Sequence, residues 1–267
     1  MSLRPPDSLR SEYGAWTWAV AWEWPDLATT WRLEAPAADR AIAGRVVFLK
    51  VVRSGHYPTA PDEAERTIWA RRHVPVPELI DRGSDETVDW IITAAIPGMD
   101  ATRHPLLADP ARIVPIVARG LAAFHRAAPV ADCPFDFRAT TALAHAQARV
   151  RAGIATAPDL HPEHTHLGLD GALRELERLT PAAEDLVVCH GDYCMPNVLL
   201  DETGTITGYV DLGELGVADR WWDVAVGAWS TTWSIGPGWE ELFYESYGIE
   251  PDPDRIRFFR LLYDLAS

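Results

Sequence analysis

The sequence has few cysteines and no long apolar run. Three cysteines in 267 residues cannot all pair and are too few for a disulfide framework, so a reducing compartment is expected. No stretch of about 18 uncharged apolar residues occurs, which excludes a membrane-spanning helix. The first residues, Met1 to Asp7, lack the apolar core of a secretory signal. We therefore expect a cytoplasmic protein with no membrane partner.

Positive charge is also scarce. The chain has 24 basic and 39 acidic residues, which gives a net charge of −15. Nucleic acids are bound by clusters of lysine and arginine, so a nucleic-acid partner is not expected. An acidic surface suits a cationic small molecule or simply keeps the protein in solution, and charge alone does not choose between these. Nothing in the sequence predicts a protein partner.

Lysine and asparagine each occur once, as Lys50 and Asn197, whereas 23 of the basic residues are arginine. Lysine is normally among the commonest residues. Its near absence is typical of a G+C-rich genome, which disfavours lysine and asparagine codons. A residue that remains alone under such a bias is either a chance survivor or is kept for its chemistry. The question is therefore whether Lys50 and Asn197 belong to one mechanism.

The chain changes character near residues 94–98. Before this point, short-period and β-branched apolar patterns predict strands over 16–24, 29–33, 45–52 and 90–96, with a helix over 61–72. After it, helical spacing predominates over 109–128, 139–152, 169–179 and from 219 onward, and three short strands are expected at 186–188, 198–200 and 206–210. We predict an α+β fold with a β-rich N-terminal lobe over residues 1–95 and a larger helical lobe over 96–267.

Polar residues typical of phosphoryl transfer gather between residues 188 and 223. Asp192 and Asn197 lie five apart on a loop between two strands, and Asp211 follows the next strand, just before Gly213. One carboxylate can orient an attacking hydroxyl and take its proton, while an amide carbonyl and a second carboxylate are oxygen ligands for Mg²⁺. An upstream lysine held by a helical glutamate neutralises phosphates in kinases, and Lys50 fits that place.

The same stretch resembles the aminoglycoside phosphotransferase family, closest to the branches that act on a 3′ or 3″ hydroxyl. The resemblance rests on His190-Gly191-Asp192 with Pro196-Asn197, on Val210-Asp211-Leu212-Gly213 and on Gly216-Val217-Ala218-Asp219-Arg220. It covers about residues 45–260. It implies a bilobal protein-kinase-like fold, Mg²⁺, and ATP or GTP as donor. The implied reaction transfers the γ-phosphoryl group to a hydroxyl of an aminoglycoside-type antibiotic and inactivates the drug.

The resemblance also implies a role for individual residues. Asp192 would be the catalytic base, and His190 would support its loop. The metal would be bound by Asn197 and Asp211. The nucleotide would be held by Lys50, by Glu63 paired with it, by the backbone carbonyl of Thr93 and by the amide of Ala95.

Three departures bear on how substrates bind. The glycine-rich loop that covers phosphates is replaced by Trp24-Pro25-Asp26-Leu27-Ala28-Thr29-Thr30. Relatives often carry arginine where this chain has Glu214, and their acidic, aromatic ending is here Tyr263-Asp264-Leu265-Ala266-Ser267. We expect Glu214 and Asp264, with Glu241, to meet ammonium groups of the drug. Trp222 and its neighbouring tryptophans, Trp221, Trp229 and Trp233, either line the acceptor pocket or pack in the core.

Simpler interpretations and other functions stay open. Asp192, Asn197 and Asp211 could be ordinary turn residues, and Glu63 a first-turn helix carboxylate. A solvated loop explains His161, His164 and His166 better than a metal site does, and packing explains Cys189 and Cys194. The acceptor could instead be a sugar-bearing nucleoside antibiotic. A nucleotide-sensing pseudokinase is the remaining alternative, favoured by the missing glycine loop and opposed by the intact polar set.

Overall fold

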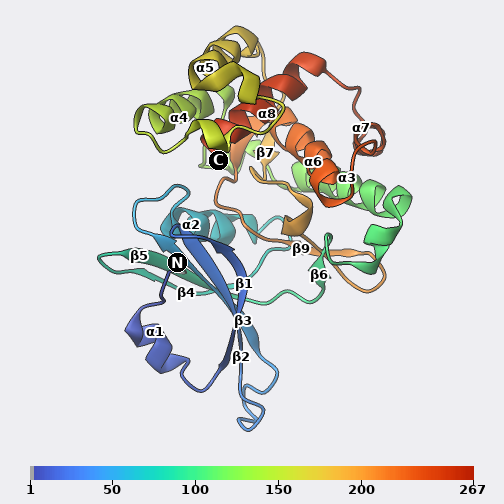
Figure 1. The fold of residues 1–267 in the computed structure, drawn as a ribbon. Coiled ribbons are helices and arrows are strands. Elements are labelled where there is room, and N and C mark those ends of the chain that lie inside the picture. The colour runs from blue at the N-terminus through green and yellow to red at the C-terminus, as the bar shows by residue number, and fades with distance from the viewer. Residues whose placement is uncertain (1–2) are drawn as a thin grey trace. The chain divides into compact units, whose positions relative to one another are not determined.

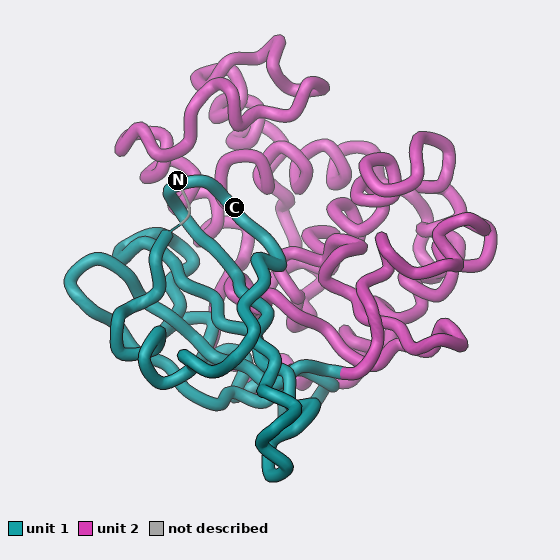
Figure 2. Tube along the Cα trace, turned by 60° about the horizontal axis from the view of Figure 1, so that its bottom comes forward, with its two compact units in different colours: residues 1–96 teal, residues 97–267 magenta. Residues whose placement is uncertain are grey.

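The structure, a computed structural model, describes residues 3–267 and divides into two units after Ile96. Figure 2 colours the N-terminal unit teal and the C-terminal unit, Pro97–Ser267, magenta. The first unit is mainly an antiparallel sheet, and the second is mainly helical (Figure 1). The predicted α+β architecture, with a small β-rich part and a larger helical part, is confirmed.

The N-terminal unit contains a five-stranded sheet in the order β1-β2-β3-β5-β4, with every neighbouring pair antiparallel. The strands are β1 (Thr17–Trp24), β2 (Ala28–Glu34), β3 (Val46–Arg53), β4 (Leu79–Ser84) and β5 (Val88–Ala94). The central strand β3 is rich in valine, and its side chains alternate between buried and half-buried positions. Such β-branched side chains pack well on a pleated surface, which explains why this strand lies at the centre.

Each face of this sheet is covered by one helix. The helix α1 (Asp7–Glu12) packs with Leu9 on a core that includes Leu33, Leu49 and Ile92. On the other face, α2 (Ala60–Ala70) buries Ala60 and Ala64 against the sheet. Small alanine side chains let this helix approach the strands closely. The sheet therefore presents one face to a large apolar core and the other to α2.

The edge strands differ from the sequence prediction. The apolar pattern of residues 16–24 predicts a strand, and β1 forms there, but it is an edge strand whose side chains are mostly exposed. Trp22 and Trp24 are 49% and 42% exposed. The other edge strand, β4, was not predicted because its sequence, Leu-Ile-Asp-Arg-Gly-Ser, is short and half polar. An edge strand pairs with a neighbouring strand on one side only, so its sequence shows a weaker apolar pattern than that of a central strand.

The C-terminal unit is built on helices that surround α8 (Pro253–Ala266). This helix packs against α4, α5 and α6 and buries Phe258, Phe259 and Leu262. The remaining long helices are α3 (Pro110–Ala127), α4 (Ala139–Arg151), α5 (Gly168–Leu179), α6 (Trp221–Ser234) and α7 (Glu240–Tyr247). Short 3-10 turns connect them: η1 (Pro105–Ala108), η2 (Val130–Asp132), η3 (Ala157–Asp159) and η4 (Thr165–Leu167). In residues 3–267, no helix combines the length and apolar character needed to cross a membrane.

Two small sheets in this unit hold the polar stretch. The strands β7 (Leu186–Cys189) and β10 (Gly216–Asp219) pair antiparallel. The strands β6 (Met99–Asp100), β8 (Val198–Leu200) and β9 (Ile206–Tyr209) form the other sheet in the order β6-β8-β9. The turn η5 (Met195–Asn197) leads directly into β8. Consequently, residues 190–197 and 210–215 are short loops fixed at both ends by strands.

Candidate active site

In the N-terminal unit, Lys50 and Glu63 form an ion pair. Lys50 lies in the middle of β3, opposite Thr30 of β2 and Ile91 of β5. Its Nζ donates to Oε2 of Glu63 at 2.7 Å, and the two side chains are 16% and 9% exposed. Partial burial of both charges makes this contact stronger than an exposed ion pair. The structure thus brings together the lysine and glutamate that the sequence analysis singled out.

The start of α2 explains why Glu63 occupies this position. Thr59 caps the helix by accepting a hydrogen bond from the amide of Asp62, and Pro61 follows in the first turn. Both features are typical of helix N-termini. The same first turn carries Glu63, whose negative charge is favourable near the positive end of the helix dipole. Capping therefore fixes the register that turns Glu63 toward Lys50.

The backbone after β5 differs from the expectation. The amide of Ala95 was expected to hold the nucleotide base, but it donates to the carbonyl of Val46 at 3.1 Å. The amide of Ala94 donates to Glu78. Within the described residues, the amide of Ile96 donates to no backbone carbonyl. Thr93 lies inside β5, paired with Phe48 and Leu79. The prediction for Ala95 is therefore corrected, and the first amide available after β5 is that of Ile96.

In the C-terminal unit, the loop after β7 is anchored by the buried carboxylate of Asp223. Its Oδ2 accepts from the amide of His190 at 2.7 Å and its Oδ1 from the amide of Gly191 at 3.0 Å. Gly191 has a φ of +92°, and a Cβ there would lie 2.4 Å from the carbonyl oxygen of Glu214. Only glycine fits both the backbone conformation and this close approach. The loop that carries Asp192 is consequently held in one conformation.

Asp192 and Asn197 are joined directly. The Nδ2 of Asn197 donates to Oδ2 of Asp192 at 2.8 Å and to its backbone oxygen at 2.9 Å. Asn197 closes η5, where its own amide donates to Cys194. Because Nδ2 is turned toward Asp192, the side-chain carbonyl oxygen of Asn197 points away from that carboxylate. This orientation leaves an oxygen, rather than a nitrogen, for a ligand.

Asp211 follows β9 with an unusual backbone. Its φ is +63°, a conformation that non-glycine residues seldom adopt. The amide of the preceding residue, Val210, donates to the carbonyl of Asn197 at 3.0 Å, which ties the two loops together. Strained residues of this kind cluster at functional sites. Asp192, Asn197 and Asp211 are thus presented on two adjoining loops of one unit.

His190 is fully buried, between Phe124, Tyr193 and Tyr209. Burial lowers the pKa of its imidazole, and the nearby carboxylates of Asp223, Asp192 and Asp211 only partly oppose this effect. The Nδ1 accepts from the amide of Asp192 at 3.3 Å, whereas Nε2 has no hydrogen-bond partner among residues 3–267. A neutral, enclosed ring of this kind supports the loop and is poorly suited to exchange protons with a ligand.

The three residues predicted to contact substrate are placed differently from the expectation. Glu214 is 4% exposed, and its Oε2 accepts from the Ser267 hydroxyl at 2.8 Å. Burial, and next the charge of Asp192, raise its pKa to about 8, so it is mostly neutral at pH 7.

The Asp264 carboxylate accepts from the backbone amide of His161 and from the ring of His164. Trp222 is fully buried and donates to the carbonyl of Gly191. The expected contacts of Glu214 and Asp264 with ammonium groups of the drug are therefore corrected, and of the two alternatives for Trp222 the structure shows core packing.

Two of the neighbouring tryptophans and the two cysteines flanking the loop are buried as well. Trp221 and Trp229 are buried, and Trp233 is 45% exposed. The thiols of Cys189 and Cys194 are buried, which raises the pKa of each. Packing is therefore the interpretation that fits both cysteines, because a protonated buried thiol is a poor nucleophile.

Sequence reasoning did not identify a buried hydrogen-bond relay behind the loop. Asp223 accepts from His125 Nε2 at 2.9 Å, and Tyr247 contacts Nδ1 of the same ring at 2.8 Å. Arg220 in turn donates to the Tyr247 hydroxyl at 3.3 Å. A carboxylate only accepts, so Nε2 carries the proton and Nδ1 accepts from tyrosine. In residues 3–267, one group of histidine, cysteine and acidic side chains is compact enough to hold a metal ion, namely His125, Cys189 and Asp223. The carboxylate of Asp223 is already engaged by the hydrogen bonds described above.

Tyr263 was also missed as a contact of the site. Its hydroxyl donates to Oδ1 of Asp192 at 2.8 Å, although the two residues are 71 positions apart. The sequence shows only a tyrosine near the end of a helix, and no local signal links it to Asp192. Asp223, by contrast, could have been noticed, since it closes the polar stretch that contains Asp192.

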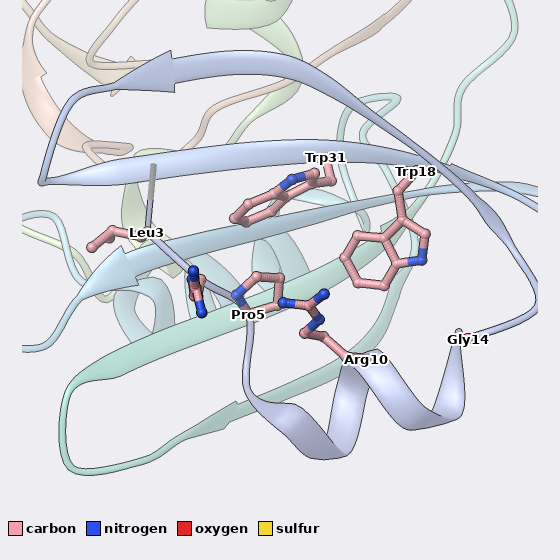
Figure 3. Close-up of a pocket in the computed structure, with 7 residues that line it drawn as sticks. Leu3, Pro5, Arg10, Gly14, Trp18 and Trp31 are labelled. Carbon is pink, nitrogen blue, oxygen red and sulfur yellow. The ribbon is translucent and has the colours of Figure 1, made fainter. Parts of the chain in front are cut away.

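A surface hollow of the N-terminal unit lies away from Lys50. It measures about 730 Å³, and Trp18, Trp31 and Arg10 line it together with the first described residues (Figure 3). Thr30 pairs with Lys50 and shares its face of the sheet, so the adjacent Trp31 points to the opposite face. This hollow is therefore separate from the ion pair. A hollow of about 510 Å³ in the other unit lies between the starts of α7 and α8.

Comparison with known proteins adds the family context. The sequence model of the phosphotransferase enzyme family matches residues 19–259. An aminoglycoside 3′-phosphotransferase of Streptomyces fradiae is 41% identical over 208 residues, covering 75% of this chain and 77% of the relative. A streptomycin 3″-kinase of Streptomyces griseus is 36% identical, covering 85% and 87%.

Solved structures agree with these relatives. An aminoglycoside-3′-phosphotransferase of type VIII superposes with a TM-score of 0.86 at 32% identity, covering 97% of both chains. An aminoglycoside 3″-phosphotransferase from Streptomyces rimosus, in complex with ADP and streptomycin, gives a TM-score of 0.77 at 26% identity, covering 97% of this chain and 96% of that one.

Proposed function

The chain belongs to the aminoglycoside phosphotransferase family, a group of small-molecule kinases, and from that premise we propose the reaction and the residues that perform it. The protein transfers the γ-phosphoryl group of ATP or GTP to a hydroxyl of an aminoglycoside and so inactivates the antibiotic. The 3′ hydroxyl is the first choice, because the 3′-phosphotransferase relatives include the 41% identical one. ATP and GTP are cytoplasmic, which is where the reaction is expected.

The observation that carries this proposal is the joined pair of Asp192 and Asn197, with Asp211 on the adjoining loop. A base for an acceptor hydroxyl must lie within hydrogen-bond reach of it and must stay ionised. Asp192 accepts hydrogen bonds at both carboxylate oxygens, which fix the orientation of the carboxylate. It therefore suits the role of base, with His190 supporting the loop.

The donor set fits a divalent metal. Asn197 offers a side-chain carbonyl oxygen because its Nδ2 is engaged by Asp192, and Asp211 offers a carboxylate. Such hard oxygen atoms are the ligands that Mg²⁺ prefers. When bound, Mg²⁺ would neutralise charge on the transferring phosphates. We accordingly assign Asn197 and Asp211 to the metal.

The nucleotide residues lie in the N-terminal unit. Lys50, oriented by Glu63, would contact the phosphates as a positive charge that is held in place beforehand. The Ile96 amide, with the backbone at Thr93, would hold the base, since the amide of Ala95 is used by Val46. Thr30 lies opposite Lys50 on β2, so its side chain is on the same face of the sheet as the lysine.

In the chemical step, the acceptor hydroxyl gives its proton to Asp192 as its oxygen attacks the γ-phosphorus. One oxygen–phosphorus bond forms, and the bond between the γ-phosphorus and the bridging oxygen breaks. The nucleoside diphosphate leaves with that oxygen and its electron pair. Positioning and charge stabilisation supply most of the rate enhancement in such reactions.

The decisive experiment measures Mg²⁺-dependent release of ADP and GDP with a panel of acceptors. The panel contains aminoglycosides with a free 3′ hydroxyl, their 3′-deoxy analogues, streptomycin and a sugar-bearing nucleoside antibiotic. Turnover with the 3′-hydroxyl compounds and none with the deoxy analogues is expected. Turnover with the nucleoside antibiotic alone would refute the aminoglycoside assignment, and nucleotide binding without any turnover would favour a nucleotide sensor.

Replacing the base tests the assignment of Asp192. We expect Asp192→Ala to lower kcat about 100-fold or more, because a general base contributes roughly that factor, while nucleotide affinity changes little. Glu202→Gln, an exposed acidic residue on the turn after β8, is the matched control and should retain full activity. Equal loss in both variants, or none in either, would contradict the assignment.

A further inference from the structure

The carboxylate of Asp192 is already hydrogen-bonded on both oxygens within its own unit. Asn197 donates to Oδ2 at 2.8 Å. Two groups donate to Oδ1, the Tyr263 hydroxyl at 2.8 Å and the Cys194 thiol at 3.1 Å. A carboxylate oxygen has two lone-pair directions, so both directions of Oδ1 are used, whereas Oδ2 accepts from Asn197 alone. A hydroxyl that approaches Oδ1 must therefore displace one of its two donors.

Tyr263 is the donor that most resembles an acceptor hydroxyl. It is an O–H group at 2.8 Å, within the distance at which a general base engages the proton it removes. Asn197 cannot be displaced in the same way, since it also holds the backbone oxygen of Asp192. The thiol of Cys194 is a weaker donor and lies two residues away on the same loop.

The last turn of α8 holds the phenol in this place. Asp264, the next residue, accepts from the amide of His161 and from His164 Nδ1, at 2.9 and 2.7 Å. Burial of Tyr263, followed by the charge of Asp192, raises the pKa of the phenol well above 10. The group therefore stays protonated and remains a hydrogen-bond donor at neutral pH.

From this arrangement we infer that Tyr263 occupies, on Oδ1 of Asp192, the place that the acceptor hydroxyl takes in catalysis. The inference rests on the proposed function, because it requires Asp192 to be the base. It has two consequences. Without an acceptor, the phenol keeps water off Oδ1 of the base and suppresses wasteful hydrolysis of nucleotide. With an acceptor, the incoming hydroxyl must displace the phenol from Oδ1. This requirement favours acceptors whose other groups bind the protein strongly.

Tyr263→Phe tests the inference, because it removes one oxygen and keeps the ring. A hydrogen bond to a carboxylate is worth about tenfold in an equilibrium. We expect NDP release from MgATP without acceptor to rise at least about fivefold, and the acceptor KM to fall by a similar factor. The kcat with saturating acceptor should change less than about twofold. The phenol contact is absent from both the acceptor complex and the transition state, so its removal changes their stability relative to free enzyme equally and alters KM alone.

Controls separate this role from simple support of the loop. Tyr244→Phe removes a buried phenol that contacts Arg260 instead of Asp192, and hydrolysis should stay at the wild-type level. Adding Asp192→Ala to Tyr263→Phe should abolish the extra hydrolysis. Tyr263→Met, a second apolar replacement, should likewise raise acceptor-free NDP release and lower the acceptor KM. Urea unfolding of each variant checks that all are folded.

Two results would overturn the inference. One is a fall in kcat at unchanged KM and unchanged hydrolysis, which would make Tyr263 a positioning residue for Asp192. The other is extra hydrolysis that persists without Asp192. If the wild type phosphorylates no aminoglycoside, the proposed acceptor class fails, but the acceptor-free assay still decides the role of Tyr263.

Discussion

At the scale of single residues, the surroundings of Glu214 determine its charge. Its side chain is buried, with one oxygen bonded to Ser267 and the other without a hydrogen-bond partner in residues 3–267. Burial and the nearby Asp192 favour the neutral form, which places the pKa at about 8. A residue chosen from sequence for its negative charge is thus mostly uncharged near neutrality. Electrostatic attraction of a cationic drug has to come from other acidic groups.

This raised pKa predicts a pH-dependent stability. Between the ordinary glutamate pKa of about 4.3 and the folded value of about 8, the folded state binds a proton that the unfolded state has lost. Stability contributed by the protonated form is therefore lost as pH rises through this window. Glu214→Gln cannot ionise, so its free energy of unfolding should fall less from pH 5.5 to pH 8.5. Urea unfolding at both pH values measures this, and parallel curves for the two proteins would refute it.

At the scale of elements, three helices meet behind the catalytic loop through the relay of Arg220, Tyr247, His125 and Asp223. His125 comes from α3, Tyr247 from α7 and Asp223 from α6. The donors run from Arg220 through Tyr247 and His125 to Asp223, and this carboxylate also accepts from the amides of His190 and Gly191. The buried carboxylate thereby fixes the loop to the helical core. Packing and hydrogen bonding together determine where Asp192 lies.

Breaking the relay at His125 should weaken both stability and catalysis. His125→Phe removes the Nε2 donor and leaves the buried Asp223 with one partner fewer, which costs about 1–3 kcal/mol of unfolding free energy. The loop then loosens, so kcat should fall with little change in nucleotide affinity. His166→Phe, at an exposed position, is the control. Urea unfolding and steady-state rates measure the effects, and an unchanged unfolding free energy would exclude the relay.

The elements that the sequence predicted best have strong local patterns. The β-branched run of β3 and the apolar face of α3 were identified because burial imposes their periodicity. The strands β4 and β10 and the helix α1 were not identified, because each is short and has few apolar residues of its own. Predicted helix ends were off by up to two residues, as for 61–72, where α2 ends at Ala70.

The candidate site shows the same division. Asp192 and Asn197 were found because five residues on one loop bring them together, and Lys50 because its residue type is so rare in this chain. Tyr263, Tyr247 and His125 reach the loop only through the packing of helices distant in sequence. The burial of Trp222 and Glu214 also depends on that packing. Their type and spacing alone do not determine whether a ligand can reach them.

At the scale of the whole molecule, a net charge of −15 acts on both substrates with opposite sign. An aminoglycoside carries several positive charges, so the field of the protein attracts it. A nucleoside triphosphate is anionic, even with Mg²⁺, and is repelled. These long-range interactions are screened by salt, with a Debye length of about 30 Å at 0.01 M and about 8 Å at 0.15 M. The two substrates should therefore respond oppositely to ionic strength.

The expected result is that raising NaCl from about 0.01 M to 0.15 M increases KM for the aminoglycoside several-fold and lowers KM for MgATP. Sucrose, which is uncharged, at matched osmolality controls for solvent effects. The kcat at saturating substrates should stay within about twofold. Local contacts alone would give a different pattern, because salt also weakens the attraction between Lys50 and phosphate and would raise KM for MgATP. A parallel rise of both KM values would thus show that individual contacts outweigh the net charge of the molecule.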